Sequence, residues 1–126
     1  MIVVESREGR LLAHGALMTD ICEAVYMLTM IIPVGSATTY SSIARVLGVH
    51  PRIVARCLSL NRDPILVPCH RVVYSNGGLG GYTPGGVGVK RRLLEVEGVV
   101  FQGNRVKKEC LIDIHSLLHG LDRLKH

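Results

Sequence analysis

The sequence lacks tryptophan, and aromatic residues make up only 4% of its 126 residues, whereas hydrophobic residues make up 48%. The core is therefore expected to be aliphatic. A chain of this length is typical of one domain and can bury a core without disulfide or metal support. It contains no run of about 18 apolar residues, and its start lacks the basic-then-apolar order of a signal peptide. These absences argue against a membrane partner and predict a cytoplasmic protein.

Zinc-binding patterns are also absent. None of the four cysteines forms a C-x-x-C pair, and the six histidines do not complete a zinc spacing, so we expect no metal and no cofactor. Because disulfide frameworks are rare in intracellular chains, Cys22 and Cys57, which lie in apolar, helix-like contexts, are predicted to be buried packing residues rather than a disulfide. Cys69 differs from both in its neighbours.

The charge balance is basic. Fifteen lysines and arginines oppose ten acidic residues, which gives a net charge of +5 and a pI near 9.3. Such a balance favours polyanionic partners, nucleic acid first and acidic membranes second. A basic protein without a polyanionic partner is the alternative.

Hydrophobic periodicity and turn residues predict a mostly helical chain. The expected elements are a short strand over 1–4, helices over 20–31, 41–47, 51–60, 89–98 and 111–124, and a glycine-dense loop over 75–86. Thr19 or Asp20 would cap the first helix, and Pro33 would follow its end.

The helices over 41–47 and 51–60 form a helix-turn-helix pattern. Gly48 lies where a C-cap glycine belongs, and Pro51 lies at the first position of the next helix. Many helical hairpins share this pattern, but the second helix carries Arg52 and Arg56. A basic second helix favours contact with nucleic acid.

The segment 67–73, "VPCHRVV", places a nucleophile beside a base. Pro68 prevents a regular helix through Cys69, and Val67 before it is pushed to an extended conformation. Cys69 should therefore lie on a non-helical or helix-start segment. Three interpretations stay open: a packing cysteine, a protease-like pair with His70, or a thiolate served by a water–histidine–carboxylate relay. Direct contact is disfavoured, because adjacent side chains diverge.

Residues 32–98, which begin "IPVGSATTYSSIARVLG" and end "LLEVEG", resemble the O6-alkylguanine-DNA alkyltransferases, which repair DNA by direct reversal. The P-C-H-R-V segment, an asparagine before it and a glycine loop after it carry the resemblance. It implies a small helical domain over 20–104, with a helix-turn-helix and a glycine-rich active-site loop. Residues 1–19 would be a short strand or hairpin remnant, and 105–126 a helical C-terminal extension.

The resemblance also implies roles for individual residues. Cys69 would accept the alkyl group, and His70 and Glu97 would complete a water-bridged relay that generates the thiolate. Asn61 would tie the recognition helix to the active-site segment. Tyr40 would help to rotate the nucleotide and donate a proton to the base.

Further residues would contact the DNA or the base. Arg52 would enter the duplex in place of the flipped nucleotide, and the small Ala55 would allow close approach to the minor groove. Arg56 belongs to the same DNA-binding helix. The guanine pocket would be lined by Pro68, the backbone carbonyl of Val72, Tyr82 and Thr83.

The implied reaction is a single, irreversible transfer to Cys69, because the thioether product cannot be hydrolysed by this machinery. The implied partner is double-stranded DNA containing alkylated guanine, bound by a monomer that becomes nucleoid-associated. Two alternatives stay open: an alkyltransferase-like protein that binds lesions and recruits other factors, although such relatives lack the cysteine, and a DNA-binding alkylation sensor.

The sequence differs from the family pattern at three points. About 19 residues precede the first expected helix, where the family usually has a larger N-terminal domain, so we expect a protein partner to replace that domain. The turn before Arg52 is about two residues shorter, and Pro84 is an addition to the glycine loop. These differences are expected to alter the grip on DNA or the size of the pocket.

Overall fold

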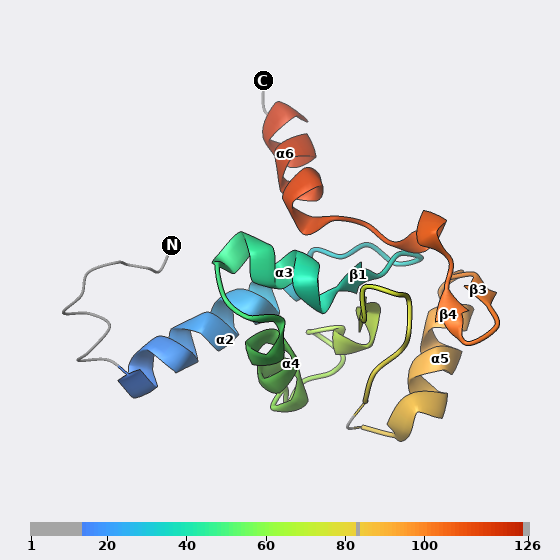
Figure 1. Ribbon diagram of the computed structural model, residues 1–126, viewed down its shortest axis with the longest axis horizontal. Coiled ribbons are helices and arrows are strands. Elements are labelled where there is room, and N and C mark those ends of the chain that lie inside the picture. The colour runs from blue at the N-terminus through green and yellow to red at the C-terminus, as the bar shows by residue number, and fades with distance from the viewer. Residues whose placement is uncertain (1–13, 83, 125–126) are drawn as a thin grey trace.

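The structure is a computed structural model that describes residues 14–82 and 84–124 (Figure 1). The strand expected over 1–4 lies outside these residues, as does most of the expected N-terminal remnant. The elements are α2 (His14–Met30), β1 (Thr38–Thr39), α3 (Tyr40–Leu47), α4 (Pro51–Ser59), the 3-10 helix η1 (Cys69–Arg71), β2 (Val72–Val73), α5 (Gly86–Val96), β3 (Phe101–Gln102), β4 (Arg105–Val106), η2 (Lys108–Cys110) and α6 (Ile114–Leu124). The expected fold class, a small and mostly helical domain, is confirmed.

The helix-turn-helix forms as the sequence predicts. Thr39 caps α3 by accepting a hydrogen bond from the Ser42 amide at 2.9 Å, so the helix begins at Tyr40. Gly48 ends it in the left-handed conformation, with φ at 70°. Pro51 then opens α4, and its N-cap His50 accepts from the Arg52 amide at 3.0 Å. Short, well-capped helices therefore set the geometry of the motif.

Helix α2 begins six positions earlier than expected. The prediction placed its start at Thr19 or Asp20, but the helix runs from His14 to Met30. Residues 16–18 are Ala, Leu and Met, which are strong helix formers, so helix continues through the two potential caps. None of the helices in the described ranges is long and apolar enough to cross a membrane.

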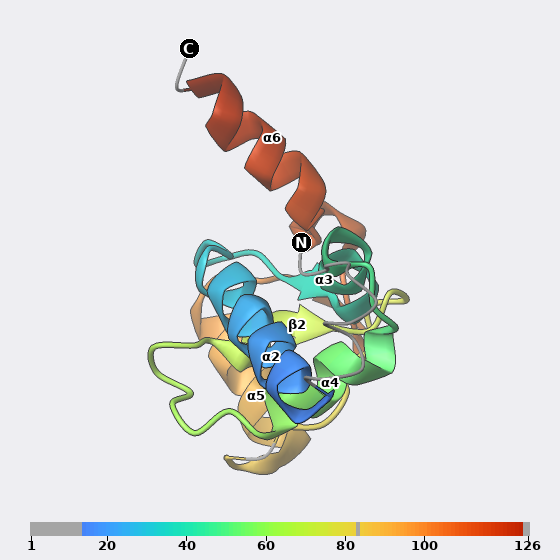
Figure 2. The ribbon, with the colours of Figure 1, turned by 90° about the vertical axis from the view of Figure 1, so that its left-hand side faces the viewer.

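The later helices also differ from their expected bounds. α5 begins at Gly86, three residues before the expected start, and Gly98 follows it with φ at 99°. α6 begins at Ile114 rather than 111, because Asp113 caps it by accepting from the Ser116 amide at 3.0 Å. In both ribbon views α6 projects away from the rest of the molecule (Figures 1 and 2).

Two small strand pairs were not predicted from the sequence, because two-residue strands carry almost no periodic signal. β1 pairs in parallel with β2, which places Thr38 opposite Val72. β3 and β4 form an antiparallel hairpin. The expected domain boundary after residue 104 falls in the turn of this hairpin, and the division at that residue stays a prediction.

The chain after the hairpin returns to the centre of the domain. The Ala37 amide donates to Cys110 O at 2.9 Å, and the Ile112 amide donates to Ala37 O at 2.8 Å. Ile114 is fully buried in the main core. At least the first part of the expected extension is thus packed against α3 and β1.

The main core fills the space between α2, α3 and α4 and is mainly aliphatic, as expected. The cysteine prediction was wrong, because Cys22 on α2 and Cys57 on α4 form a disulfide. Their Cα atoms lie 5.1 Å apart, within the range that a disulfide spans. The prediction relied on the rarity of disulfides in intracellular proteins, but packing of α2 against α4 brings the two cysteines into contact. The bond ties α4 covalently to α2.

Candidate active site

Cys69 begins a single 3-10 turn and is almost buried, with 8% of its surface exposed. Pro68 precedes it, and the Arg71 amide closes the turn on the Pro68 carbonyl at 2.9 Å. The predicted helix-start position is therefore confirmed. Asn61, just beyond α4, donates through Nδ2 to the Val67 carbonyl at 3.0 Å. This bond fixes the approach to Cys69 relative to the end of α4.

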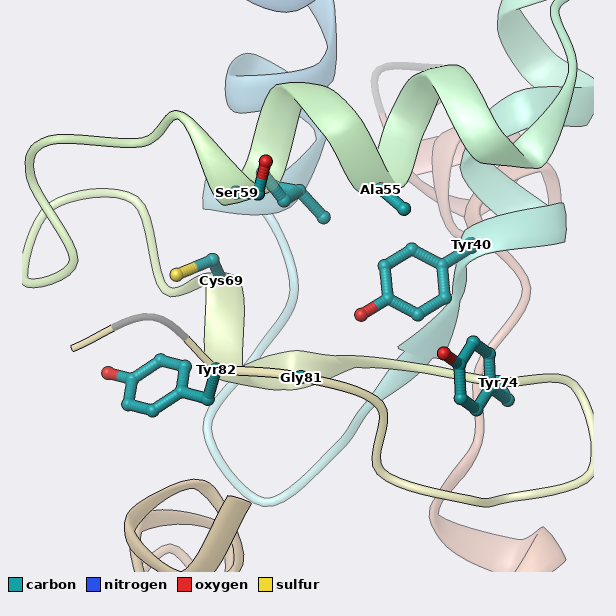
Figure 3. A pocket seen from close by; sticks show the side chains of 8 residues that line it. Tyr40, Ala55, Ser59, Cys69, Tyr74, Gly81 and Tyr82 are labelled. Carbon is teal, nitrogen blue, oxygen red and sulfur yellow. The ribbon is translucent and has the colours of Figure 1, made fainter. Parts of the chain in front are cut away.

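A cavity of about 220 Å³ opens beside Cys69 (Figure 3). Helix α4 forms one wall with Ala55, Leu58 and Ser59, and the segment with Gly81 and Tyr82 forms the opposite wall. Tyr40 and Tyr74 complete the lining. We call this cavity the reaction pocket. Three tyrosines and one thiol in a half-enclosed space suit a flat, polar-edged ring.

His70, Arg71 and Glu97 form a compact network behind the pocket. His70 Nε2 lies 2.9 Å from Glu97 Oε2, and Arg71 donates to both carboxylate oxygens, through Nε at 2.9 Å and Nη2 at 2.8 Å. Arg71 Nη1 also donates to the Ile32 carbonyl at 2.9 Å. This bidentate pair, anchored to the backbone just beyond α2, holds the Glu97 carboxylate in one orientation.

The pKa values of the network favour a neutral imidazole beside an ionised carboxylate. Burial lowers the pKa of His70, and this outweighs the opposing effect of the Glu97 hydrogen bond. Burial raises the pKa of Glu97, but hydrogen bonds from Arg71 and His70 reverse this and leave the pKa lowered. His70 Nδ1 is buried and has no hydrogen-bond partner in the described part of the chain. A direct Cys69–His70 hydrogen bond is thus absent, as the divergence of adjacent side chains predicts.

Lys90 is the feature of this site that sequence analysis missed most completely. It lies in "VKRRLL", which reads as a solvent-exposed basic helix, yet its side chain is fully buried. Its Nζ lies 3.4 Å from Tyr40 Oη and 3.2 Å from the Gly81 carbonyl. Burial lowers the pKa of Lys90 to about 8, against a smaller opposing effect of Cys69. The amine therefore contacts Tyr40, one of the three tyrosines of the reaction pocket.

Tyr40 keeps its proton over a wide pH range. Burial, with smaller effects of Tyr74 and Cys69, raises the pKa of Tyr40 to about 12. Its hydroxyl also requires Gly80 beside it, because a Cβ at that glycine would lie 3.0 Å from Tyr40 Oη and the glycine has φ at 73°. The glycine loop is thus needed here for close approach as well as for its turn.

The structure brings several of the predicted residues together. Tyr40, Ala55, Cys69 and Tyr82 line the reaction pocket, while Asn61, His70 and Glu97 support it from behind. Pro68 and Val72 are buried and lie near Cys69 in the chain, but neither belongs to the pocket lining, where the prediction placed them. Arg52 and Arg56 are exposed on α4 and lie outside the pocket lining, and Thr83 falls outside the described residues.

Sequence analysis did not single out Leu58, Ser59 or Tyr74 as pocket residues. Leu58 and Ser59 follow Ala55 by about one helical turn, so the spacing could have found them. Tyr74 directly follows β2, and only the fold shows that it faces Tyr40, with ring centroids 5.4 Å apart. Within the described ranges, no three histidine, cysteine or acidic side chains lie close enough to hold a metal ion.

Comparison with known families bears directly on this arrangement. The family model described as "6-O-methylguanine DNA methyltransferase, DNA binding domain" matches residues 20–99, well over half of the chain. This chain belongs to that family. The matched range contains every residue that lines the reaction pocket, from Tyr40 to Tyr82.

Individual family members agree with this assignment. The methylated-DNA–protein-cysteine methyltransferase of Methanothermobacter thermautotrophicus is 53% identical over 72 residues, which are 57% of this chain and 40% of that protein. Mycobacterium tuberculosis OGT in complex with DNA has a TM-score of 0.59 and 38% identity, over 63% of this chain and 50% of that one.

A smaller solved protein matches across almost its whole length. S. pombe Atl1, in complex with damaged DNA containing O6-carboxymethylguanine, has a TM-score of 0.63 and 28% identity, over 75% of this chain and 95% of that one. By contrast, this chain spans only 40–49% of the length of curated methyltransferases of the family.

Proposed function

We propose that this chain repairs DNA by moving an alkyl group from the O6 atom of guanine to the Cys69 sulfur. The observation that carries the proposal is the position of Cys69: an almost buried thiol at the edge of a 220 Å³ pocket lined by three tyrosines. The family's curated methyltransferases, some of them about 50% identical over the matched range, support it.

His70 and Glu97 act as the base system in this proposal. The neutral imidazole takes the Cys69 proton at Nδ1 through a bridging water, because Nε2 is held by Glu97. Glu97, fixed by Arg71, stabilises the imidazolium that forms. The free thiolate is the strongest nucleophile that the pocket offers.

The transfer then exchanges one bond for another. The Cys69 sulfur forms a bond to the alkyl carbon, the carbon–O6 bond breaks, and its electron pair goes to the guanine. Tyr40 supplies a hydrogen bond or a proton to the leaving base, and Lys90 holds the Tyr40 hydroxyl in place. The thioether that remains has no route back to thiol here, so each molecule acts once and needs no cofactor.

The target base must leave the helix to reach this pocket. We assign the grip on DNA to α4, which carries the exposed Arg52 and Arg56 and lines the pocket with Ala55. Arg52 takes the place of the flipped nucleotide, and Ala55 permits close approach in the minor groove. Complexes of related proteins with DNA support DNA as the partner, and we take its form to be double-stranded. The bound form would be a monomer associated with the nucleoid.

A second candidate function is lesion binding without transfer. The match to Atl1 bound to damaged DNA, which covers 95% of that chain, favours it. The two candidate functions can be distinguished at Cys69, because alkyl transfer requires its thiol and lesion binding does not.

The experiment compares Cys69→Ser with Cys110→Ser, the other free cysteine in the described residues. Both variants and the wild type are incubated with a duplex containing O6-methylguanine, and loss of the methylated base is measured together with duplex affinity. We expect Cys69→Ser to bind DNA but leave the base methylated, while Cys110→Ser matches the wild type. A wild type that binds the lesion and leaves it methylated would support the second candidate instead.

A further inference from the structure

A second hollow lies next to the reaction pocket, on the side of the β3–β4 hairpin. Its near part, of about 430 Å³, is lined by residues that include Tyr74, Arg91 and Arg105, and its far part by residues that include Lys107 and Lys108. Asn76 and Arg105 line both parts, so the two lie side by side. We call the whole hollow the hairpin groove, defined by Tyr74, Asn76, Arg91, Arg105, Lys107 and Lys108.

The groove carries positive charge that the protein does not neutralise. Arg105 and Lys108 are exposed and Lys107 is half-buried, and none of the three forms an ion pair within the described residues. Glu109 is the one carboxylate of the lining. Three unpaired cations against one anion along a hollow surface favour an elongated polyanion as ligand.

The groove is held in shape by backbone contacts. The Val106 amide donates to the Gly77 carbonyl at 2.9 Å, and Arg105 forms a β-bridge with Gly78. A Cβ at Gly77 would lie 2.7 Å from the Val106 carbonyl, so only glycine permits this approach. Arg91 supports the hairpin from α5 by donating to the Gly103 carbonyl at 3.0 Å. Binding would therefore cost little ordering of the backbone.

Tyr74 connects the groove to the reaction pocket, because it lines both hollows. Its ring packs near Tyr40 on one side, yet 53% of its surface is exposed. Helix α4 forms the opposite wall of the pocket. Tyr74 therefore lies between a base held in the pocket and the cations of the hairpin groove.

We propose that the hairpin groove binds the sugar–phosphate backbone of the DNA strand that flanks the extruded guanine. Arg105, Lys107 and Lys108 contact phosphates, and the exposed Tyr74 ring stacks on a neighbouring base. The proposal rests on the proposed function, and it adds a second DNA contact on the side of the pocket opposite α4. Because phosphate contacts carry no sequence information, the groove would hold any flanking sequence.

The test measures the salt dependence of affinity for a short duplex with one O6-methylguanine. Arg105→Gln and the double variant Lys107→Gln/Lys108→Gln are compared with Arg92→Gln, an exposed arginine of α5 outside both hollows. The log–log slope should become shallower by about 0.9 for Arg105→Gln and by about 1.8 for the double variant. Arg92→Gln should keep the wild-type slope, and Arg105→Lys should restore most of it.

The outcomes separate this proposal from the proposed function. If the wild type binds and transfers but all variants keep its slope, the groove does not contact DNA and the proposal is overturned alone. If the wild type neither binds the duplex nor transfers, the proposed function fails and this proposal fails with it. Circular dichroism of each variant verifies the fold, and because the substitutions are made in two separate proteins, loss of fold in one leaves the other as a test.

Discussion

The network behind the reaction pocket and the outer face of α4 both contain arginine, but the arginines differ in burial and in their hydrogen-bond partners. Arg71 is half-buried and donates to Glu97 and to the Ile32 carbonyl. Arg52 and Arg56 are exposed, and neither forms an ion pair within the described ranges. The first arrangement is preorganised for chemistry at one atom. The second is free to follow a phosphate backbone, so the two regions should respond differently to substitution.

The largest difference should appear in stability. Arg71→Met leaves the Glu97 carboxylate partly buried without its bidentate partner, so we expect the free energy of unfolding to fall by about 3–5 kcal/mol. Arg56→Met removes an exposed charge and should change it by less than about 0.5 kcal/mol. Urea unfolding of both variants measures the two values. Equal losses would mean that the pocket network is not a structural unit.

The disulfide joins the two regions, since it fixes α4 on α2. Reduction should lower the free energy of unfolding by about 3–4 kcal/mol, the chain-entropy value for a loop of this length. The measurement is thermal unfolding with and without dithiothreitol, for the wild type and for Cys22→Ser. The variant should unfold like the reduced wild type under both conditions. A wild type insensitive to the reductant would contradict the role given to the bond.

Lys90 should lower the stability of the folded protein while supporting the reaction in the pocket. Its folded pKa of about 8 lies below the ordinary value of 10.5, so the buried charge costs about 3 kcal/mol below pH 8. Between these two values the folded protein releases the proton while the unfolded chain keeps it, so wild-type stability rises with pH in this window.

Lys90→Met should remove that dependence. The variant should be more stable than the wild type below pH 8, and the advantage should shrink to nothing by about pH 10.5. Its transfer rate should fall, because Tyr40 loses the contact that holds its hydroxyl. Unfolding measured as a function of pH tests this directly. A constant difference between variant and wild type across the window would show that Lys90 does not titrate there.

The smallest expected effect is that of Arg52 on the rate of transfer, and it tests the role of the exposed face of α4. If Arg52 fills the space left by the flipped nucleotide, Arg52→Ala should slow transfer from duplex DNA about tenfold or more. Transfer from the free alkylated base, which needs no flipping, should stay near the wild-type rate. Single-turnover rates on both substrates give the answer. A similar loss on both would place Arg52 among the residues that support the pocket.

Features set by local sequence signals could be predicted, and features set by tertiary packing could not. The helix-turn-helix was predictable because Gly48 and Pro51 are local signals with fixed positions. The turn at Cys69 was predictable because Pro68 restricts the backbone on both sides. The His70–Glu97 contact came from resemblance, since 27 residues separate the two and no local rule joins them.

The contacts that could not be predicted depend on tertiary packing. Lys90 has the sequence context of a surface lysine and is buried only because α5 packs against the Cys69 turn. The Cys22–Cys57 bond depends on how α2 crosses α4, which periodicity does not determine. The hairpin groove arises from backbone pairing between Gly78 and Arg105, far apart in sequence.

The central claim, that Cys69 is an irreversible acceptor in a preorganised pocket, is tested most directly by stoichiometry. The wild-type chain is incubated with excess O6-methylguanine duplex, and the intact mass and the mass of the Cys69 peptide are followed to completion. The account predicts a plateau at one methyl group per chain, carried by Cys69, with no further base repaired. Continued repair beyond one equivalent, or a methyl group on Cys110, would contradict it.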